Sequence, residues 1–323
     1  MDQYHRSVLL REAVDALNIR DAWYLDCTLG DGGHSIEIIK RGGKVVGIDV
    51  DPQALERVQR RFRNEENDEN KLRLVKGNFR DIKNLIRTCF ARSPVSPDFT
   101  ARSQNLAFLA DAKNVKQTDT ASQKFAGAIF DLGVSSLQLE SPERGFSFAK
   151  LGPLDMRMDP SLAVAALDLL NALSRKELYG LFKNLGEEKY SKRLADTLVS
   201  AREVRPIKNT LELAEIVEKV VGRREKIHPA TRVFQALRIA VNDELGALQE
   251  GLDQVKDLIE KNGHIVVISF QSLEDRIVKN TFKQWEIMGL GKVLTKKPVV
   301  PDDLEIADNP RSRSAKMRVF EKL

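Results

Sequence analysis

The stretch Trp23-Tyr24-Leu25-Asp26-Cys27-Thr28-Leu29-Gly30-Asp31-Gly32-Gly33-His34 decides how the chain begins to fold. An apolar run ends in an acid, a glycine-rich turn follows, and a helix-forming segment begins at Ser35. Glycines let the backbone curl tightly and approach a ligand without side-chain obstruction. A second apolar run, over 44–48, ends in Asp49. This acid lies about 20 residues beyond the turn, where nucleotide-binding α/β folds place the carboxylate that holds ribose hydroxyls. The pattern predicts a nucleoside-cofactor site.

Two acids in this stretch bear on which cofactor binds. Gly30, Gly32 and Ser35 nearly satisfy the dinucleotide pattern, so the glycines alone leave NAD open. Asp26, at the end of the first strand, can help to neutralise the α-ammonium group of S-adenosylmethionine. A pyrophosphate would instead be repelled by Asp26 and Asp31 beside the helix N-terminus, where an anion should bind. The residues therefore favour S-adenosylmethionine over NAD.

The composition is that of a globular protein long enough for two domains. The 323 residues are 42% hydrophobic and 31% charged, with a net charge of +5 and a pI near 9.0. This basic balance permits a polyanionic partner without requiring one. No apolar run has the length of a membrane span and the N-terminus lacks an apolar signal core, so we expect a cytoplasmic protein with no membrane partner. Cys27 and Cys89 lack metal-type spacing, so we expect no metal site.

The first half of the chain alternates between strand and helix patterns. Strands are expected over 24–26, 44–49, 72–75 and 126–130, with helices over 35–41 and 52–62. Such alternation predicts an α/β fold with a parallel sheet and right-handed crossovers. The polar and weakly periodic stretch over 92–124 is interpreted as a surface insertion.

Helical patterns dominate the stretch from about 140 to 229, which contains no strand pattern. We interpret residues 140–229 as a helical domain, expected to recognise the substrate. It would be inserted into a cofactor-binding α/β domain formed by residues 1–139 and 230–323.

The α/β pattern resumes after this insert. A long amphipathic helix is expected from about Thr231 to Glu260, because apolar residues recur there at spacings of three and four. Gly263 would cap that helix, and strands would follow over 264–269 and 317–320.

Eight further motifs follow the glycine-rich turn in order. They are Asp131–Leu139, Glu143–Phe148, Gly152–Asp159, Gly186–Glu188, His228–Arg232, Phe234–Asn242, Ser272–Arg276 and Asn309–Lys316. Together they closely resemble the bacterial 16S ribosomal RNA cytosine-N4 methyltransferase (MraW/RsmH) family. The resemblance runs from His5 to the C-terminus, with the stretch over 92–124 outside it.

This resemblance implies a particular reaction and fold. The enzyme would use S-adenosylmethionine to methylate the exocyclic N4 amine of one cytidine in the decoding region of small-subunit ribosomal RNA. It would carry the helical insert on a Rossmann-like class I methyltransferase sheet, and its partner would be the small ribosomal subunit. A homodimer is left open.

The resemblance also implies a set of cofactor-binding residues. By motif these are Gly32, Gly33, His34, Asp49, Phe79, Asp131 and Gln138. The residues themselves support part of this assignment, because Asp49, Phe79 and Asp131 each follow an expected strand. Such positions lie at the carboxyl edge of a parallel sheet, where α/β folds bind ligands.

The catalytic candidates are hydrogen-bond acceptors for the target amine, since an acceptor there raises nucleophilicity and takes developing positive charge. Many amino-methyltransferases carry an Asn- or Asp-Pro-Pro-aromatic loop after the fourth strand. This chain has Asp131-Leu132-Gly133-Val134 there instead. Our candidates are Asp131 and Asp155, the second from a later loop.

Two residues depart from the family pattern. Leu137 stands where the family usually has proline, and Gln271 stands where it has histidine. Glutamine can form hydrogen bonds but cannot carry a proton near neutral pH. We therefore infer that the family's histidine at this position is not an essential acid or base.

Candidate substrate contacts come from the loop over 144–159, the edge of the long helix and the C-terminal basic run. They are Arg144, Arg157, Arg232, Arg238, Asn242, Arg311 and Arg313. Such side chains position RNA chiefly through its phosphates. Each also has a plainer interpretation as part of an ordered loop or a solvated surface.

Two other classes of function stay open. One is a non-catalytic ribosome-assembly factor that keeps the fold, to which Gln271 lends slight support. The other is an NAD-linked oxidoreductase, which the acids around the glycine-rich turn disfavour.

Overall fold

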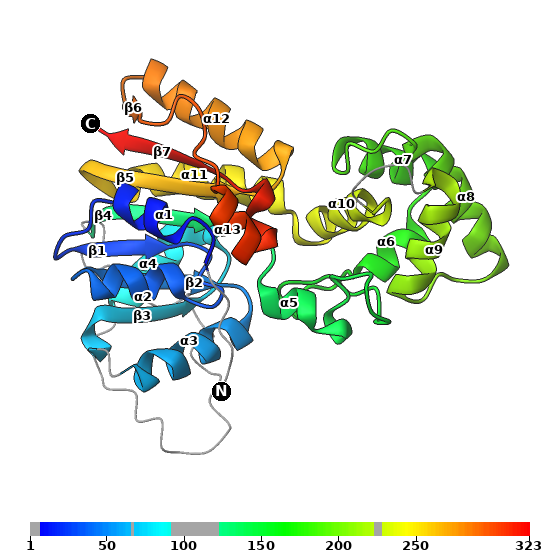
Figure 1. The fold of residues 1–323 in the computed structure, drawn as a ribbon, viewed down its shortest axis with the longest axis horizontal. Coiled ribbons are helices and arrows are strands. Elements are labelled where there is room, and N and C mark those ends of the chain that lie inside the picture. Colours follow the sequence, from blue (N-terminus) through cyan, green and yellow to red (C-terminus); the bar gives the residue numbers. More distant parts are fainter. Residues whose placement is uncertain (1–6, 66–67, 92–122, 223–227) are drawn as a thin grey trace. The chain divides into compact units, whose positions relative to one another are not determined.

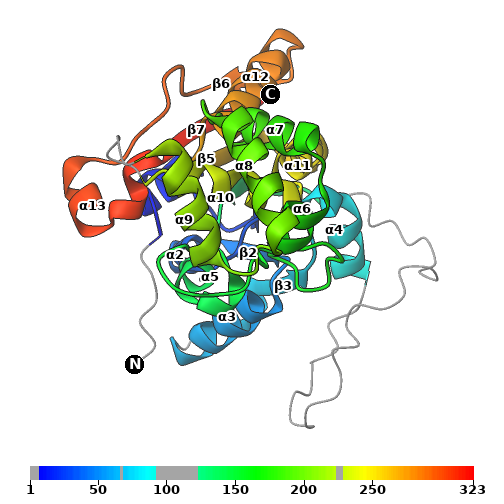
Figure 2. The ribbon, with the colours of Figure 1, turned by 90° about the vertical axis from the view of Figure 1, so that its right-hand side faces the viewer.

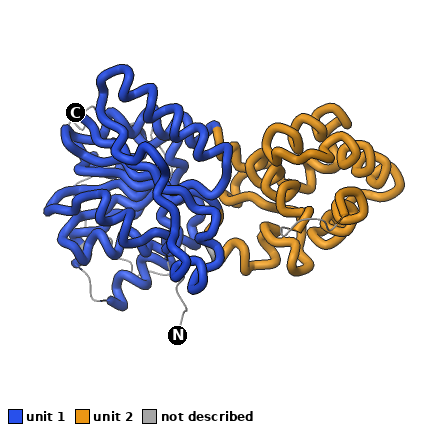
Figure 3. Tube along the Cα trace, turned by 45° about the horizontal axis from the view of Figure 1, so that its top comes forward, with its two compact units in different colours: residues 1–133, 246–323 blue, residues 134–245 orange. Residues whose placement is uncertain are grey.

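The computed structural model describes residues 7–65, 68–91, 123–222 and 228–323. The chain forms two compact units, which we call the sheet unit (residues 1–133 and 246–323) and the helical unit (residues 134–245; Figure 3). The expected surface insertion over 92–124 lies outside the described residues except for its last two positions. Within the described ranges, no helix combines the length and the apolar character that a membrane span needs.

The sheet unit is built on a sheet with the strand order β3-β2-β1-β4-β5-β7-β6 (Figure 1). The strands are β1 (Trp23–Asp26), β2 (Lys44–Asp49), β3 (Leu72–Lys76), β4 (Phe125–Asp131), β5 (Ile259–Ser269), β6 (Gly291–Val293) and β7 (Lys316–Lys322). Strands β1 to β5 are parallel, and β7 pairs antiparallel with β5 and β6. The strand order reverses between β1 and β4, which is where such sheets bind ligands. The expected Rossmann-like α/β fold is confirmed.

Helices cover both faces of this sheet. They are α1 (Leu10–Ala16), α2 (Gly33–Lys40), α3 (Pro52–Asn64), α4 (Ile82–Ala91), α11 (Glu244–Leu258), α12 (Ser272–Ile287) and α13 (Asp303–Asp308). On one face Leu25 belongs to a core shared with α4, α11 and α12. On the other face its neighbour Tyr24 belongs to a core shared with α1, α2 and α3. Because both faces are buried at the centre of the sheet, the central strands β1 and β4 are apolar up to the acid that ends each of them.

The helical unit contains no strand among its described residues, only an isolated bridge between Pro153 and Asn209. Its helices are α5 (Ser136–Glu140), α6 (Ala166–Ala172), α7 (Arg175–Asn184), α8 (Ser191–Val204), α9 (Thr210–Val221) and α10 (Ala230–Asn242), labelled in Figure 2. One core joins them, and Leu170, Phe182 and Leu237 in it are fully buried. The compact unit spans 134–245, whereas the helical domain interpreted from the sequence spans 140–229.

The prediction of a single long helix from Thr231 to Glu260 was wrong. The chain instead forms α10 and α11, separated at Asp243, whose φ of 46° is left-handed. The apolar spacing runs through the break, but the two segments bury their faces in different cores. Leu237 packs in the core of the helical unit and Leu248 in the core of the sheet unit.

The expected cap at Gly263 was also wrong. Helix α11 ends at Leu258, and the next residue, Ile259, already pairs with Phe125 of β4. Gly263 lies inside β5, where the register of the pairing with β4 shifts. The helical pattern therefore ends before the glycine that we took as its end.

Candidate active site

The glycine-rich turn joins β1 to α2 and needs glycine at two adjacent positions. Gly32 caps α2 with a left-handed φ of 71°, and a Cβ atom there would lie 2.8 Å from the Val58 side chain of α3. A Cβ atom on Gly33 would overlap the Ser7 hydroxyl. Side chains from two neighbouring segments therefore pack directly against the turn, and only glycines leave room for them.

Asp49 ties the turn to the end of β2. Its Oδ2 accepts a hydrogen bond from the Gly30 amide at 2.8 Å, and its Oδ1 accepts one from the Asp51 amide at 2.8 Å. Burial raises the pKa of Asp49 to about 6. The Asp49 side chain thus lies at the end of β2 beside the turn, which is the position that the sequence predicted for a ribose-binding acid.

Asp26 lies at the end of β1 and is 2% exposed. Its Oδ2 accepts a hydrogen bond from the Ser35 hydroxyl at 2.6 Å, and its Oδ1 accepts one from the Thr28 amide at 3.2 Å. These partners are a hydroxyl and an amide rather than a cation, so burial raises the pKa of Asp26 to about 6.

Asp131 ends β4, next to β1. Its amide donates a hydrogen bond to Thr28 Oγ1 at 2.6 Å, and its Oδ2 lies 3.6 Å from Nδ1 of the buried His34. The Oδ1 atom is buried without a hydrogen-bond partner among the described residues. Burial, and then the charges of Asp26 and Glu274, raise the pKa of Asp131 well above its usual value. A buried acceptor without a partner indicates a place for a ligand's donor.

Glu274 is a site residue that the sequence analysis missed. It lies in the first turn of α12, is 2% exposed, and accepts a hydrogen bond from the Phe270 amide at 2.9 Å. The Gln271 backbone amide donates to Glu274 Oε2 at 3.3 Å and the Gln271 side chain donates to Glu274 Oε1 at 2.9 Å, so Glu274 reaches back to the N-cap residue Gln271 as in a capping box. The spacing of three residues before an apolar helix could have revealed this box. Gln271, the residue that departs from the family pattern, thus acts as a helix cap.

Phe79 follows β3 and completes the residues that the sheet unit gathers at its strand ends. Its ring lies edge-on to Phe130 of β4, with centroids 5.5 Å apart. Gly251 of α11 approaches so closely that a Cβ atom there would lie 2.6 Å from the Phe79 ring. The expected cofactor residues lie in the sheet unit at the ends of β1 to β4, with the exception of Gln138.

Gln138 and Asp155 belong to the helical unit. Gln138 is buried and closes a capping box with Ser135 at the start of α5. Both oxygens of Asp155 bind the Arg157 guanidinium at 2.8 Å. Burial acts to raise the pKa of Asp155, but the hydrogen bonds and charge of Arg157 outweigh it and the pKa is lowered. Asp155 is therefore an ionised carboxylate, and the Arg157 guanidinium donates a hydrogen bond to each of its two oxygens.

Two candidate substrate contacts, Arg144 and Asn242, hold the 144–159 loop within the helical unit. The Arg144 guanidinium donates to the carbonyl oxygens of Arg157 and Met158 at 3.0 Å. Asn242 accepts a hydrogen bond from the Met158 amide at 2.7 Å and donates to the Met156 carbonyl at 2.8 Å. These contacts make the loop an ordered part of the helical unit.

The remaining basic candidates differ in how they are engaged. Arg238 binds Glu244 with two hydrogen bonds, at 2.8 and 2.9 Å. Arg232 lies 3.9 Å from the buried Glu188. Arg311 and Arg313 are exposed on a 3₁₀ turn (Pro310–Ser314) of the sheet unit, just before β7. The structure thus divides these candidates between the two units.

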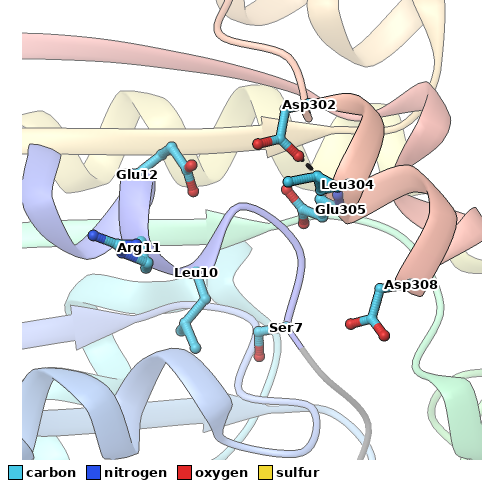
Figure 4. Close-up of a pocket in the computed structure, with 8 residues that line it drawn as sticks. All are labelled: Ser7, Leu10, Arg11, Glu12, Asp302, Leu304, Glu305 and Asp308. Atoms are coloured by element: carbon cyan, nitrogen blue, oxygen red, sulfur yellow. Dashed lines mark hydrogen bonds between the residues drawn. The ribbon is translucent and has the colours of Figure 1, made fainter.

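A cavity of about 430 Å³ in the sheet unit contains none of the candidate residues. Figure 4 shows side chains from α1, α13 and their flanking segments around it. The lining residues are Ser7, Leu10, Arg11, Glu12, Asp302, Leu304, Glu305 and Asp308. Asp302 caps α13, and Glu305 accepts a hydrogen bond from the Leu9 amide at 2.7 Å. These acids have structural roles at helix ends.

Known proteins resemble this chain over its whole length. The sequence pattern of the MraW methylase family matches residues 2–323. The ribosomal RNA small subunit methyltransferase H of Halothermothrix orenii is 39% identical, over 99% of this chain and 98% of that protein. The proteins of the same name from Persephonella marina and Carboxydothermus hydrogenoformans are 40% and 41% identical, over 99% and 100% of this chain and 99% of each relative. The chain therefore belongs to the MraW methylase family.

Proposed function

We propose that this protein transfers a methyl group from S-adenosylmethionine to the exocyclic N4 amine of one cytidine in the decoding region of small-subunit ribosomal RNA. Its partner would be the small ribosomal subunit, and it would work in the cytoplasm. Family membership and the names of the relatives support methylation of small-subunit ribosomal RNA.

The observation that carries the choice of cofactor is the set of acids at the strand ends. The Asp26 carboxyl is held by a hydroxyl and an amide, and the charges of Asp26 and Glu274 both raise the pKa of Asp131. Such a set favours a ligand that brings positive charge, since each carboxylate lowers the energy of a nearby cation. S-adenosylmethionine carries an ammonium and a sulfonium group, whereas the pyrophosphate of NAD is an anion. The site therefore favours S-adenosylmethionine.

The remaining cofactor contacts follow from the turn. Asp49 would hold the ribose hydroxyls, and Gly32 and Gly33 would let the backbone approach the cofactor. Phe79, at the end of β3, offers an apolar ring for the adenine. When bound, S-adenosylmethionine supplies the electrophilic methyl group. All of these residues belong to the sheet unit.

Asp131 is our choice for the group that receives the target amine. In the reaction the N4–methyl bond forms, the sulfur–methyl bond breaks and the amine loses one proton. The Oδ1 atom of Asp131 is a buried acceptor without a partner among the described residues, and it can accept the amine hydrogen bond and, when ionised, that proton. Asp155 is less suited, because Arg157 occupies both of its oxygens. Alignment of the amine with the methyl group can supply about 7–11 kcal/mol.

The test is methylation of purified small ribosomal subunits, with the modified nucleotide identified by mass mapping of the RNA. We expect one N4-methylated cytidine, and Asp131→Asn should lower kcat at saturating cofactor by about 10²–10⁴-fold. Asp155→Asn is the matched control, and a larger loss of kcat there would move the acceptor role to Asp155. Cofactor binding without turnover on any subunit preparation would instead favour the non-catalytic assembly factor. Binding of NADH in place of S-adenosylmethionine would reject the proposed cofactor.

A further inference from the structure

The buried His34 holds its two ring nitrogens in different surroundings. It lies in the first turn of α2, and its Nε2 is 3.2 Å from the carbonyl oxygen of Val8. A carbonyl oxygen can only accept a hydrogen bond, so Nε2 carries the hydrogen. Burial lowers the pKa of His34 to about 4, so the ring is neutral near pH 7. In a neutral ring with hydrogen on Nε2, the Nδ1 atom presents a lone pair.

That lone pair faces Asp131. The Nδ1 atom lies 3.6 Å from Asp131 Oδ2, and both side chains are largely shielded from solvent. A carboxylate oxygen opposite a nitrogen lone pair is unfavourable, whereas a protonated Oδ2 could donate a hydrogen bond to Nδ1. The charged groups that act on Asp131 favour the same state, because burial, Asp26 and Glu274 all raise its pKa.

We propose that His34 is a positioning residue for Asp131: in the cofactor-free protein Oδ2–H donates a hydrogen bond to His34 Nδ1, which leaves Oδ1 for the methyl-accepting amine. The role of Oδ1 rests on the proposed function, but the pairing of His34 with Asp131 does not. A separation of 3.6 Å is longer than a hydrogen bond, so the carboxyl group must shift by a few tenths of an ångström to form it.

The pairing has a consequence for the chemistry. His34 stabilises the protonated form of Asp131 over the ionised form, so it raises the pKa of Asp131. The positive charge of the cofactor acts in the opposite direction and lowers it. A carboxylate is the strongest base that is still ionised when its pKa lies near the working pH. The effect of His34 on the pKa of Asp131 therefore opposes the effect of the cofactor charge.

Two amide variants separate the two ring nitrogens. In His34→Gln the amide can take the place of Nε2 and keep the Val8 contact, but it leaves nothing at Nδ1. In His34→Asn the amide oxygen can take the place of Nδ1 and the Val8 contact is lost. At saturating S-adenosylmethionine we expect His34→Gln to lose kcat by about 10-fold and to move the acid limb of the kcat profile downward by about 0.5–1 pH unit, the value of one neutral hydrogen bond. His34→Asn should keep the acid limb of the parent protein.

Measurements without RNA keep the pairing testable if a variant fails to fold. The chain has four histidines, so nitrogen NMR of the parent protein can assign the His34 tautomer. We expect hydrogen on Nε2, and hydrogen on Nδ1 would overturn the proposal. Infrared titration of the Asp131 carboxyl band, assigned with Asp131→Asn, should shift to lower pH in His34→Gln, and an unshifted titration in that folded variant would overturn the pairing. If this band shifts but no cytidine is methylated, only the proposed function fails.

Discussion

The affinity for S-adenosylmethionine should rise with pH, because the acids that would receive the cofactor are partly protonated in the free protein. Burial raises the pKa of Asp26 and of Asp49 to about 6. A cation favours the ionised form of Asp26, and ribose hydroxyls donate more strongly to an ionised Asp49. Binding must therefore release protons wherever these groups are still protonated.

The size of the effect follows from the pKa values. A carboxyl group with a pKa of about 6 is about one-tenth ionised at pH 5 and about nine-tenths ionised at pH 7. If only the ionised form binds, each group raises the affinity about 10-fold between these pH values. Asp26 and Asp49 together would give about 100-fold, or about 2.7 kcal/mol.

Calorimetry at several pH values, in buffers of different ionisation enthalpy, measures both the affinity and the protons released. Asp26→Asn should lower the affinity at pH 7.5 and reduce the pH dependence by about 10-fold, since Asp26 would no longer titrate. Affinity that stays constant between pH 5 and 7.5, with no proton release, would refute the reasoning.

The stability of the free protein should respond to pH with the opposite sign. The pKa of Asp26 in the folded protein is above its usual value of 3.8. Its contribution to stability is therefore fully present below pH 3.8 and is lost as the pH rises through about 6. Thermal unfolding of the cofactor-free protein should show that Asp26→Asn removes part of the loss between pH 4 and 7.

Two further predictions concern the turn and the RNA contacts. Gly33→Ala should lower the free energy of unfolding by about 1–3 kcal/mol, measured by chemical denaturation, because the added methyl group meets the Ser7 hydroxyl. Adding Ser7→Gly should restore most of that loss, and an unchanged stability in the single variant would reject the contact. Replacing Arg311 and Arg313 with Ala should weaken RNA binding and flatten its log–log salt dependence by about 0.7–0.9 per lost phosphate contact, without changing cofactor affinity. Replacing the exposed lysines at 296–297 removes the same charge and serves as the control, and equal slopes for both double variants would make the arginines solvated surface residues.

The parts of the site predicted from the sequence are those that depend on local patterns. An apolar run followed by an acid predicts both a buried strand and the place where it ends. Asp49 and Asp131 were therefore expected at strand ends, and the structure has both there. Gly30 and Gly32 were also expected at the turn, because their left-handed backbone is a local property.

The parts that could not be predicted depend on contacts between distant segments. The spacing of apolar residues cannot show that Leu237 and Leu248 belong to different cores, so the break at Asp243 was missed. An arginine in a loop looks the same whether it binds a phosphate or a carbonyl oxygen. The sequence therefore could not show that Arg144 already donates to two carbonyl groups of its own loop.

The acids of the site connect stability to function. Asp26, Asp131 and Glu274 come from β1, β4 and α12, and the charges of Asp26 and Glu274 make it harder to ionise Asp131. A protein selected only for stability would replace such groups or pair them with cations, since an unpaired buried charge is destabilising. Among the described residues the buried Asp26 carboxyl binds a hydroxyl and an amide, which is understandable if the cation comes with the ligand. On this reasoning the energy lost in the free protein is recovered as affinity when S-adenosylmethionine binds, and the pH dependences of affinity and stability must therefore run in opposite directions.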